Sequence, residues 1–334
     1  MIEQMWRRPV RAAWVGGVLL ALLGCGSFGA STTDAPSMAQ DAGDAGAPAD
    51  AKSVESARSG PCADGLEGWS TPWQLTELVG DDGALHFQDP FVSADGLTLW
   101  ANKIVGSEWA VYRGTRASRS EPFKILTKQK GISTPDYSRP YPSMSSPSEL
   151  VITIPVGGAS LEIGAGTLAP TGDWTVSPYE ELNRPDADLW STISADGLVL
   201  VYVQRGASPN NPFETLYQVE RAAPLRSSPW GSKRELSESA VGTTLPTGLS
   251  YPALMPDGLG LFYTRDGAPG LFYAKRTTRS APFFTAASQP VQVVTFGRLE
   301  STTRVRSMTV DGCELYLMSD RDGYDDVYVA TKTN

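Results

Sequence analysis

The sequence contains a single histidine, His86, and only three cysteines in 334 residues. One histidine excludes a metal site built from several histidines and leaves Ser-His-Asp chemistry with one candidate base. Basic residues are also few, with 28 Lys and Arg against 37 Asp and Glu and a net charge of −9. Sequence-independent binding to nucleic acid needs clustered basic side chains that displace phosphate counterions. We therefore expect no nucleic-acid partner, and no motif indicates a cofactor.

Long apolar runs are scarce as well. The run Ala12–Gly24 is shorter than the about 20 residues that a membrane-spanning helix needs. It follows Arg7, Arg8 and Arg11. A positively charged segment followed by a short apolar run is typical of a secretory signal. The sequence therefore predicts an exported protein.

The end of this run, Leu22-Leu23-Gly24-Cys25, resembles a bacterial lipobox. The resemblance implies that residues 1–24 are a lipoprotein signal peptide and that Cys25 becomes acylated after cleavage. Several acyl chains hold a protein on a membrane more firmly than a single chain does. Gly26 stands where inner-membrane lipoproteins usually have Asp, so the resemblance implies an outer-membrane protein, either periplasmic or exposed at the surface. An ordinary cleaved signal peptide is the alternative.

Residues 25–66 are predicted to form a lipid-anchored, disordered linker. Ser, Thr, Ala, Asp, Gly and Pro dominate this stretch, for example in Asp41–Pro48. Such a composition has too few apolar side chains to build a core. We expect the linker to hold the folded part of the chain away from the membrane.

Glycine and proline are frequent, at 33 and 25 residues, which disfavours long helices. A turn with Asp-Gly between two apolar runs recurs along the chain, which is a strong hairpin signal. Its copies are Asp95-Gly96, Asp196-Gly197, Asp257-Gly258 and Asp311-Gly312, with a degenerate copy at 143–149. We expect the four aspartates to form turns by accepting backbone hydrogen bonds.

A second motif, proline followed by an aromatic residue, alternates with the first. Its copies are Pro72-Trp73, Pro122-Phe123, Pro178-Tyr179, Pro229-Trp230 and Pro282-Phe283. With the apolar runs between them, the two motifs predict four strands in each unit of about 50 residues, which is the blade of a β-propeller. Residues 67–334 are therefore predicted to be an all-β propeller of five four-stranded blades. The strand after Pro72 is expected to complete the last blade and close the ring.

The Ser-Ala-Asp-Gly-Leu pattern, together with Asp326-Val327-Tyr328-Val329-Ala330, resembles the WD-like repeat of TolB-type periplasmic propellers. The resemblance covers about residues 69–334. It implies the fold and a place in the cell envelope, and it leaves the activity open because the same repeat occurs in proteins of different function.

Four aspartates near the C-terminus, Asp320, Asp322, Asp325 and Asp326, bring several oxygen ligands together and suggest a calcium site. Their spacing is not that of an EF-hand, and a related loop recurs at Arg265-Asp266-Gly267 without the extra acids. We therefore interpret the segment as a structural hairpin and expect no metal, with calcium as the alternative.

Asp89-Pro90 resembles the start of the first inner strand in five-bladed glycosidases, where the aspartate acts as base or nucleophile. Such enzymes need two carboxylates in one site. The possible partners, near the starts of other inner strands, are Asp186, Asp188 and Glu300. His86 lies beside Asp89 in the sequence and is a possible lone proton carrier, although we interpret it as an incidental loop residue.

Two functions follow from these patterns. The favoured one is a non-catalytic envelope lipoprotein whose propeller binds a protein or a cell-envelope polymer. The alternative is a carbohydrate-active enzyme with its site in the central funnel. Carboxylates that converge on the propeller axis would favour the enzyme, and a polar funnel without paired acids would favour the binding protein.

A disulfide between Cys62 and Cys313 is predicted. With Cys25 acylated, these are the two remaining thiols, and export places them where disulfides persist. Ring closure brings them together, because Cys313 begins the second strand of the last blade and Cys62 precedes the fourth strand of that blade. Two unpaired thiols are the alternative.

We expect Cys25→Ser to release the protein from the membrane fraction and to abolish labelling with a radioactive or alkyne-bearing fatty acid, because the acylated cysteine would be the anchor. Fractionation and labelling of cells that express the variant test this. Membrane association and labelling equal to those of the natural chain would exclude the lipobox.

Overall fold

The computed structural model describes residues 62, 66–78, 87–105, 108–132, 143–146, 149–156, 160–182, 188–205, 214–224, 228–237, 248–265, 268–285, 288–293, 303–321 and 325–332. All of them lie in one compact unit, Ser53–Asn334. The predicted signal peptide and almost all of the predicted linker lie outside the described residues. Within the described part of the chain, no helix is long and apolar enough to cross a membrane.

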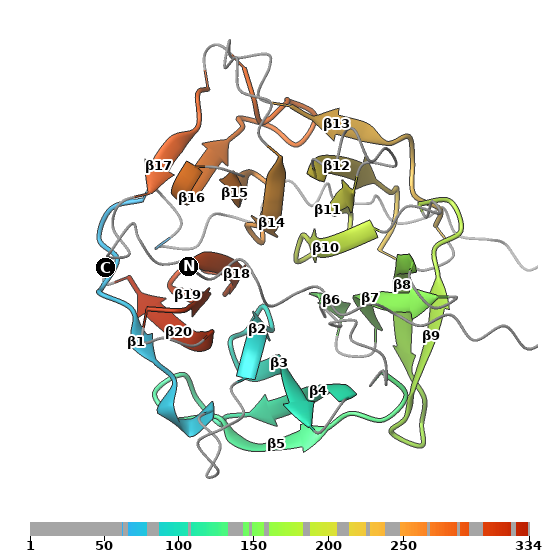
Figure 1. The fold of residues 1–334 in the computed structure, drawn as a ribbon, viewed down its shortest axis with the longest axis vertical. Coiled ribbons are helices and arrows are strands. Elements are labelled where there is room, and N and C mark those ends of the chain that lie inside the picture. The colour runs from blue at the N-terminus through green and yellow to red at the C-terminus, as the bar shows by residue number, and fades with distance from the viewer. Residues whose placement is uncertain are drawn as a thin grey trace, which may run out of the picture. The chain divides into compact units, whose positions relative to one another are not determined.

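Five antiparallel sheets of four strands each form a five-bladed β-propeller (Figure 1). Blade 1 contains β2 (Phe87–Val92), β3 (Thr98–Val105), β4 (Glu108–Thr115) and β5 (Lys124–Lys128). Blade 2 contains β6 (Ser143–Ser146), β7 (Glu149–Val156), β8 (Ser160–Leu168) and β9 (Trp174–Pro178). Blade 3 contains β10 (Asp188–Ile193), β11 (Val199–Arg205), β12 (Glu214–Glu220) and β13 (Arg234–Leu236). Blade 4 contains β14 (Leu249–Leu254), β15 (Gly260–Arg265), β16 (Ala268–Lys275) and β17 (Val291–Val293).

Blade 5 combines strands from distant parts of the chain. It contains β18 (Arg304–Met308), β19 (Glu314–Ser319), β20 (Asp326–Thr331) and, as its outer strand, β1 (Trp73–Gln74). Trp73 pairs with Val329 and Gln74 with Tyr328. A short 3₁₀ turn, Thr76–Leu78, follows β1. The predicted fold and the predicted ring closure are confirmed.

The Asp-Gly turns have the expected geometry. The glycines at positions 96, 197, 258 and 312 have φ between 69° and 78°, a region that residues with a Cβ rarely adopt. In each turn the aspartate Oδ1 accepts a hydrogen bond from the backbone N–H two residues later, at 2.7–3.1 Å. The prediction that these aspartates shape the turns is therefore confirmed.

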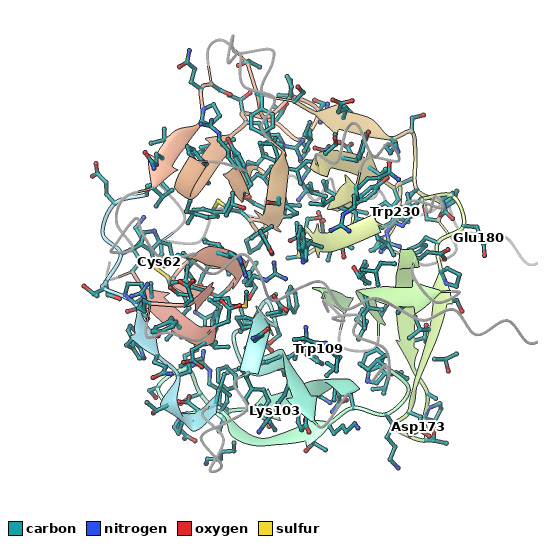
Figure 2. All side chains as sticks on the ribbon, in the orientation of Figure 1. Cys62, Lys103, Trp109, Asp173, Glu180 and Trp230 are labelled. Atoms are coloured by element: carbon teal, nitrogen blue, oxygen red, sulfur yellow. A yellow bond between two sulfur atoms is a disulfide. The ribbon has the colours of Figure 1, made fainter. Side chains whose placement is uncertain are left out.

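The core consists of five apolar clusters, one at each boundary between neighbouring blades. Strand alternation explains this arrangement: in β11, Val201 packs toward blade 4 and Tyr202 toward blade 2, and both are fully buried. In Figure 2, Trp230 fills the space between blades 2 and 3. Because each blade buries both of its faces against neighbours, the ring folds as a whole.

A buried arginine follows the third strand of three blades. In blade 1, Arg116 donates from Nε to the carbonyl of Gly96 at 2.7 Å, and its guanidinium lies 4.5 Å from the ring of Phe123. Its Nη2 reaches Glu314 of blade 5 at 2.5 Å. One side chain thus joins a turn, the aromatic residue of the second motif and the preceding blade. We name this arrangement the arginine clasp.

Blades 3 and 4 repeat the arginine clasp. Arg221 donates to Gly197 at 2.6 Å and lies 4.5 Å from Trp230, and Arg276 donates to Gly258 at 2.9 Å. They reach the preceding blades at Glu149 (3.9 Å) and Gln218 (3.0 Å), respectively. Burial lowers the pKa of Arg276 to about 10, so this guanidinium is still charged at neutral pH.

The turn aspartates also connect blades. Arg119 of blade 1 forms an ion pair with Asp311 of blade 5, and Arg279 of blade 4 forms the same pair with Asp196 of blade 3. Burial raises the pKa of Asp311, but hydrogen bonds from Thr309, Arg119 and the Cys313 N–H outweigh it and hold the pKa below the usual value.

The motif of proline followed by an aromatic residue does not have the same structural position in every blade. In blade 2 the outer strand ends at Pro178, so Pro178-Tyr179 follows the strand that it was expected to precede. In blade 5, Trp73 is 46% exposed, and Trp69 supplies the buried ring instead. Proline and an aromatic residue are common enough for the motif to occur in a different structural position.

The predicted disulfide between Cys62 and Cys313 is present, with the two Cα atoms 5.0 Å apart and a sequence separation of 251. Closing a loop of this size contributes on the order of 5 kcal/mol to the free energy of unfolding in the chain-entropy description. The bond fixes the start of the propeller to its last blade.

Candidate functional site

The innermost strand of every blade contains a β-bulge. The register shifts lie between Gln88 and Phe91 in β2, Met144 and Ser146 in β6, Leu189 and Ser191 in β10, Ser250 and Ala253 in β14, and Val305 and Ser307 in β18. A bulge bends its strand and redirects a side chain, and bulges are frequent beside functional sites. In blades 1, 3, 4 and 5 the shift begins six or seven residues before the turn aspartate, so these four bulges lie in equivalent places along the propeller axis. The shift in blade 2 instead ends at Ser146, the last residue of β6.

Backbone strain is concentrated at these bulges. Among the described residues, the non-glycine residues with positive φ are Asp89 (50°), Trp190 (26°) and Tyr251 (51°). Each lies in the bulge of an inner strand. Such conformations cost about 1–3 kcal/mol each and are typical of sites where geometry serves function. The axis is therefore the strongest candidate for a functional site.

The carboxylate of Asp89 is engaged with Arg306, which lies in the bulge of blade 5. The Arg306 Nη2 is 3.0 Å from Asp89 Oδ1, and the two side chains are 7% and 1% exposed. Asn102 donates from Nδ2 to the other carboxylate oxygen at 3.4 Å. Burial of a charge requires such compensation. The ion pair links the inner strands of the neighbouring blades 1 and 5.

An aromatic stack lies beside this ion pair. The rings of Trp190 and Tyr251 are 3.9 Å apart with an interplanar angle of 30°. The guanidinium of Arg304 lies 4.1 Å from the Tyr251 ring, and that of Arg306 lies 5.8 Å from it. Arg304 also lies 3.8 Å from a carboxylate oxygen of Asp325. We name Asp89, Trp190, Tyr251, Arg304 and Arg306 the axial cluster.

The axial cluster lies toward the end of the propeller axis at which the inner strands begin, since Arg304 is the first residue of β18. We name this end the mouth, and the Asp-Gly turns lie at the opposite end. A small cavity toward the turn end is lined by mostly apolar residues of blades 1, 3, 4 and 5, together with Thr192, Arg306 and Ser307.

The predicted carboxylates are only partly described. Asp89 lies at the axis as expected, and Asp188 begins β10, opposite Gln204. Asp186, Glu300 and His86 lie outside the described residues, as does the side chain of Asp188. The second carboxylate that a glycosidase requires is therefore not identified among the side chains that the structure describes.

The aspartates near the C-terminus have separate partners. Asp326 accepts a hydrogen bond from Gln74 Nε2 at 2.8 Å, and Asp325 faces Arg304. Asp322 is outside the described residues, whereas Asp320 follows β19. Within the described part of the chain, no group of three His, Cys, Asp or Glu side chains is placed to hold a metal ion.

The sequence analysis missed Trp190, Tyr251, Arg304 and Arg306. Proline inside a strand is usually confined to edges or bulges. Both Asp89 and Tyr251 precede a proline within an inner strand, so Asp89-Pro90 and Tyr251-Pro252 marked two of the bulges. No comparable signal marks the two arginines, because Arg306 pairs with Asp89 of blade 1 and Arg304 packs on Tyr251 of blade 4.

The sequence matches no protein-family model and no curated protein. Among solved structures, an endo-arabinase from Bacteroides thetaiotaomicron is similar, with a TM-score of 0.51 and 14% identity over 79% of this chain and 98% of that chain. TolB from Acinetobacter baumannii has a TM-score of 0.44 and 15% identity over 74% of this chain and 54% of its own. Prolyl oligopeptidase B from Galerina marginata has a TM-score of 0.42 and 10% identity, covering 70% and 31%.

These neighbours differ in function, and at such identities the likeness shows the propeller fold alone. The chain spans about half the length of TolB. The five-bladed fold rests on the sheets themselves, and the activity depends on the residues of the site.

We expect Arg306→Met to lower the free energy of unfolding by about 3–5 kcal/mol, because it leaves the buried Asp89 carboxylate without its counter-charge. Asp89→Asn should be milder, since asparagine adopts positive φ more readily than most residues. The double variant should lose less free energy of unfolding than the two single variants lose together. Urea unfolding of the four proteins tests this, and strictly additive losses would contradict the assigned ion pair.

Proposed function

We propose that this protein is a lipid-anchored protein of the cell envelope, at the outer membrane, whose propeller binds a protein or a cell-envelope polymer without chemical conversion. Cys25 is the anchor, and residues 25–66 are the linker. The binding site is the mouth, around the axial cluster.

The single observation that carries the proposal is the engagement of Asp89. A glycosidase carboxylate must reach the sugar as base or nucleophile, and it works together with a second carboxylate. Asp89 is 1% exposed and paired with Arg306. Its carboxylate therefore supports the local structure and is withheld from a ligand at the mouth.

The strained backbone supports a binding role for the mouth. The strain at Trp190 and Tyr251 holds a stacked aromatic pair beside the axis, next to the partly exposed guanidinium of Arg304. Arginine and aromatic side chains are enriched at the centres of binding sites. A rigid group of this kind recognises a ligand without needing to move.

Photo-cross-linking in living cells tests the proposal. A benzophenone amino acid at Arg321, which follows β19 at the mouth, should capture a partner. The same probe at Val310, which is 42% exposed at the turn end, is the matched control and should capture nothing specific. Arg304→Ala should abolish capture from position 321, because it removes the guanidinium that lies on the Tyr251 ring.

Two outcomes would contradict the proposal. The first is specific capture from position 310 alone, which would place the binding face at the turns. The second is release of new reducing ends from envelope polysaccharide by the purified protein, with loss of that activity in Asp89→Asn, which would favour the glycosidase.

A further inference from the structure

Blade 5 lacks the arginine of the clasp. The backbone N–H of Arg116 donates to the carbonyl of Leu97 at 3.0 Å, and the N–H of Lys332 donates to the carbonyl of Cys313 at 2.9 Å. Lys332 therefore occupies the position of the clasp arginine. Its Nζ lies 5.9 Å from the ring of Trp69, which pairs with Lys332 in an isolated bridge. In the last blade, a residue from the start of the propeller thus supplies the aromatic ring.

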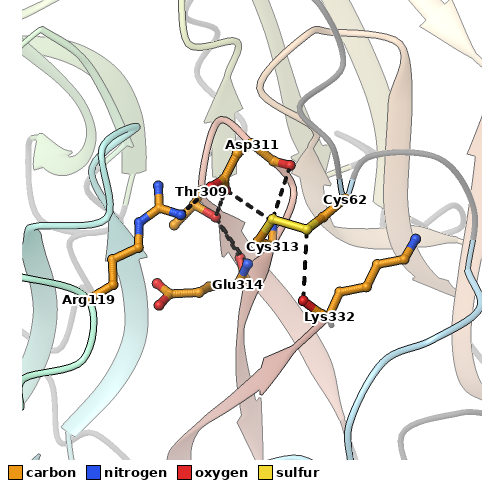
Figure 3. Close-up of a disulfide and its surroundings, with 7 residues drawn as sticks. All are labelled: Cys62, Arg119, Thr309, Asp311, Cys313, Glu314 and Lys332. Carbon is orange, nitrogen blue, oxygen red and sulfur yellow. Dashed lines mark hydrogen bonds and ion pairs between the residues drawn. A yellow bond between two sulfur atoms is a disulfide. The ribbon is translucent and has the colours of Figure 1, made fainter. Parts of the chain in front are cut away.

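In blade 5, Cys62 takes the place that Arg279 has in blade 4. Arg279 donates from Nε to the carbonyl of Asp257 at 2.9 Å. At the equivalent carbonyl of Asp311, the donor is the backbone N–H of Cys62, at 3.4 Å. The disulfide then joins Cys62 to Cys313, two residues after Asp311 (Figure 3). We name residues 62 and 66–69 the N-terminal clasp.

The N-terminal clasp lies at the boundary where the backbone hydrogen bond between neighbouring turns cannot form. Turns of neighbouring blades are joined when the N–H of Ala195 donates to Pro256 O and that of Val310 donates to Ala94 O, both at 2.9 Å. The equivalent donor from blade 4 to blade 5 would be Pro256, which has no N–H. At this boundary Cys62 and Trp69 instead line a small cavity with Met255 of blade 4.

The rest of the N-terminal attachment is short. β1 contributes two paired residues to blade 5, next to hydrogen bonds between Ser70 and Thr331. A pull from the linker would load these bonds one after another. The disulfide transfers the same pull to Cys313, at the start of β19, and β19 is paired on both sides by β18 and β20.

We propose that the N-terminal clasp is a redox-dependent mechanical stop, which carries tension from the membrane tether into the centre of blade 5 and protects β1 from being peeled off. The inference rests on the proposed anchoring at Cys25. In the oxidised protein the ring stays closed under tension. A dithiol reductant, which is itself oxidised to a disulfide, returns Cys62 and Cys313 to two thiols, and the same tension then opens the boundary between blades 4 and 5.

Magnetic tweezers test this on the full mature chain with Cys25→Ser, pulled from handles before residue 26 and after Asn334. The oxidised protein should extend only by its linker until blade 5 itself unfolds. After reduction of the same molecule, an earlier step should appear at lower force. It corresponds to release of residues 62–74, about 45 Å at 3.3–3.6 Å per residue.

The variant Cys62→Ser/Cys313→Ser should show the earlier step without reductant. Arg279→Ala, with the disulfide intact, is the matched control, because it weakens the boundary between blades 3 and 4 and should add no early step. An early step in the oxidised protein, or its absence after reduction, would overturn the proposal. Failure of fatty-acid labelling at Cys25 would instead remove the anchor and leave this mechanical result unchanged.

Discussion

The buried guanidinium of the arginine clasp is the interaction on which the ring depends. In blades 1, 3 and 4 it saturates the carbonyl of the turn glycine, packs on an aromatic ring and reaches a polar side chain of the preceding blade. A blade boundary built only from apolar side chains would leave that carbonyl buried without a donor, which costs about 1–3 kcal/mol. The arginine clasp therefore couples the conformation of the hairpin turn to the packing of neighbouring blades.

The two ends of the propeller axis are built differently as a result. At the turn end, the clasps, the ion pairs of Asp196 and Asp311 and the disulfide bind blades to each other. Toward the mouth, the backbone is strained at Asp89, Trp190 and Tyr251. A rigid turn end holds this strain, because local strain persists only where the surrounding structure determines it.

Local patterns predicted the repeated parts of the fold. Asp-Gly turns and alternating apolar strands are decided within a few residues, and ring closure follows from the order of the strands. Even the disulfide followed, because Cys62 and Cys313 were the thiols left after the predicted acylation. Each of these features depends on residues that are close in sequence, on the order of the strands or on the number of cysteines.

The parts that the sequence did not predict depend on distant partners. Arg116 contacts Glu314 and Asp89 contacts Arg306, so neither pair produces a local pattern. No local pattern marked Trp69 as the buried ring of blade 5, because its partner, Lys332, lies at the other end of the propeller. The bulges at Trp190 and Tyr251 arise where inner strands meet at the axis, and of these only Tyr251 has a proline beside it.

A double-mutant cycle between Arg116→Met and Glu314→Gln is the most direct test of the clasp. The exposed pair Lys124–Glu121, at 3.2 Å, is the reference and should couple by less than about 1 kcal/mol. Arg116 and Glu314 are 7% and 9% exposed, and we expect their coupling to lie between about 1 and 3 kcal/mol. A coupling no larger than that of the exposed pair would contradict the claim that buried arginines hold the blades together.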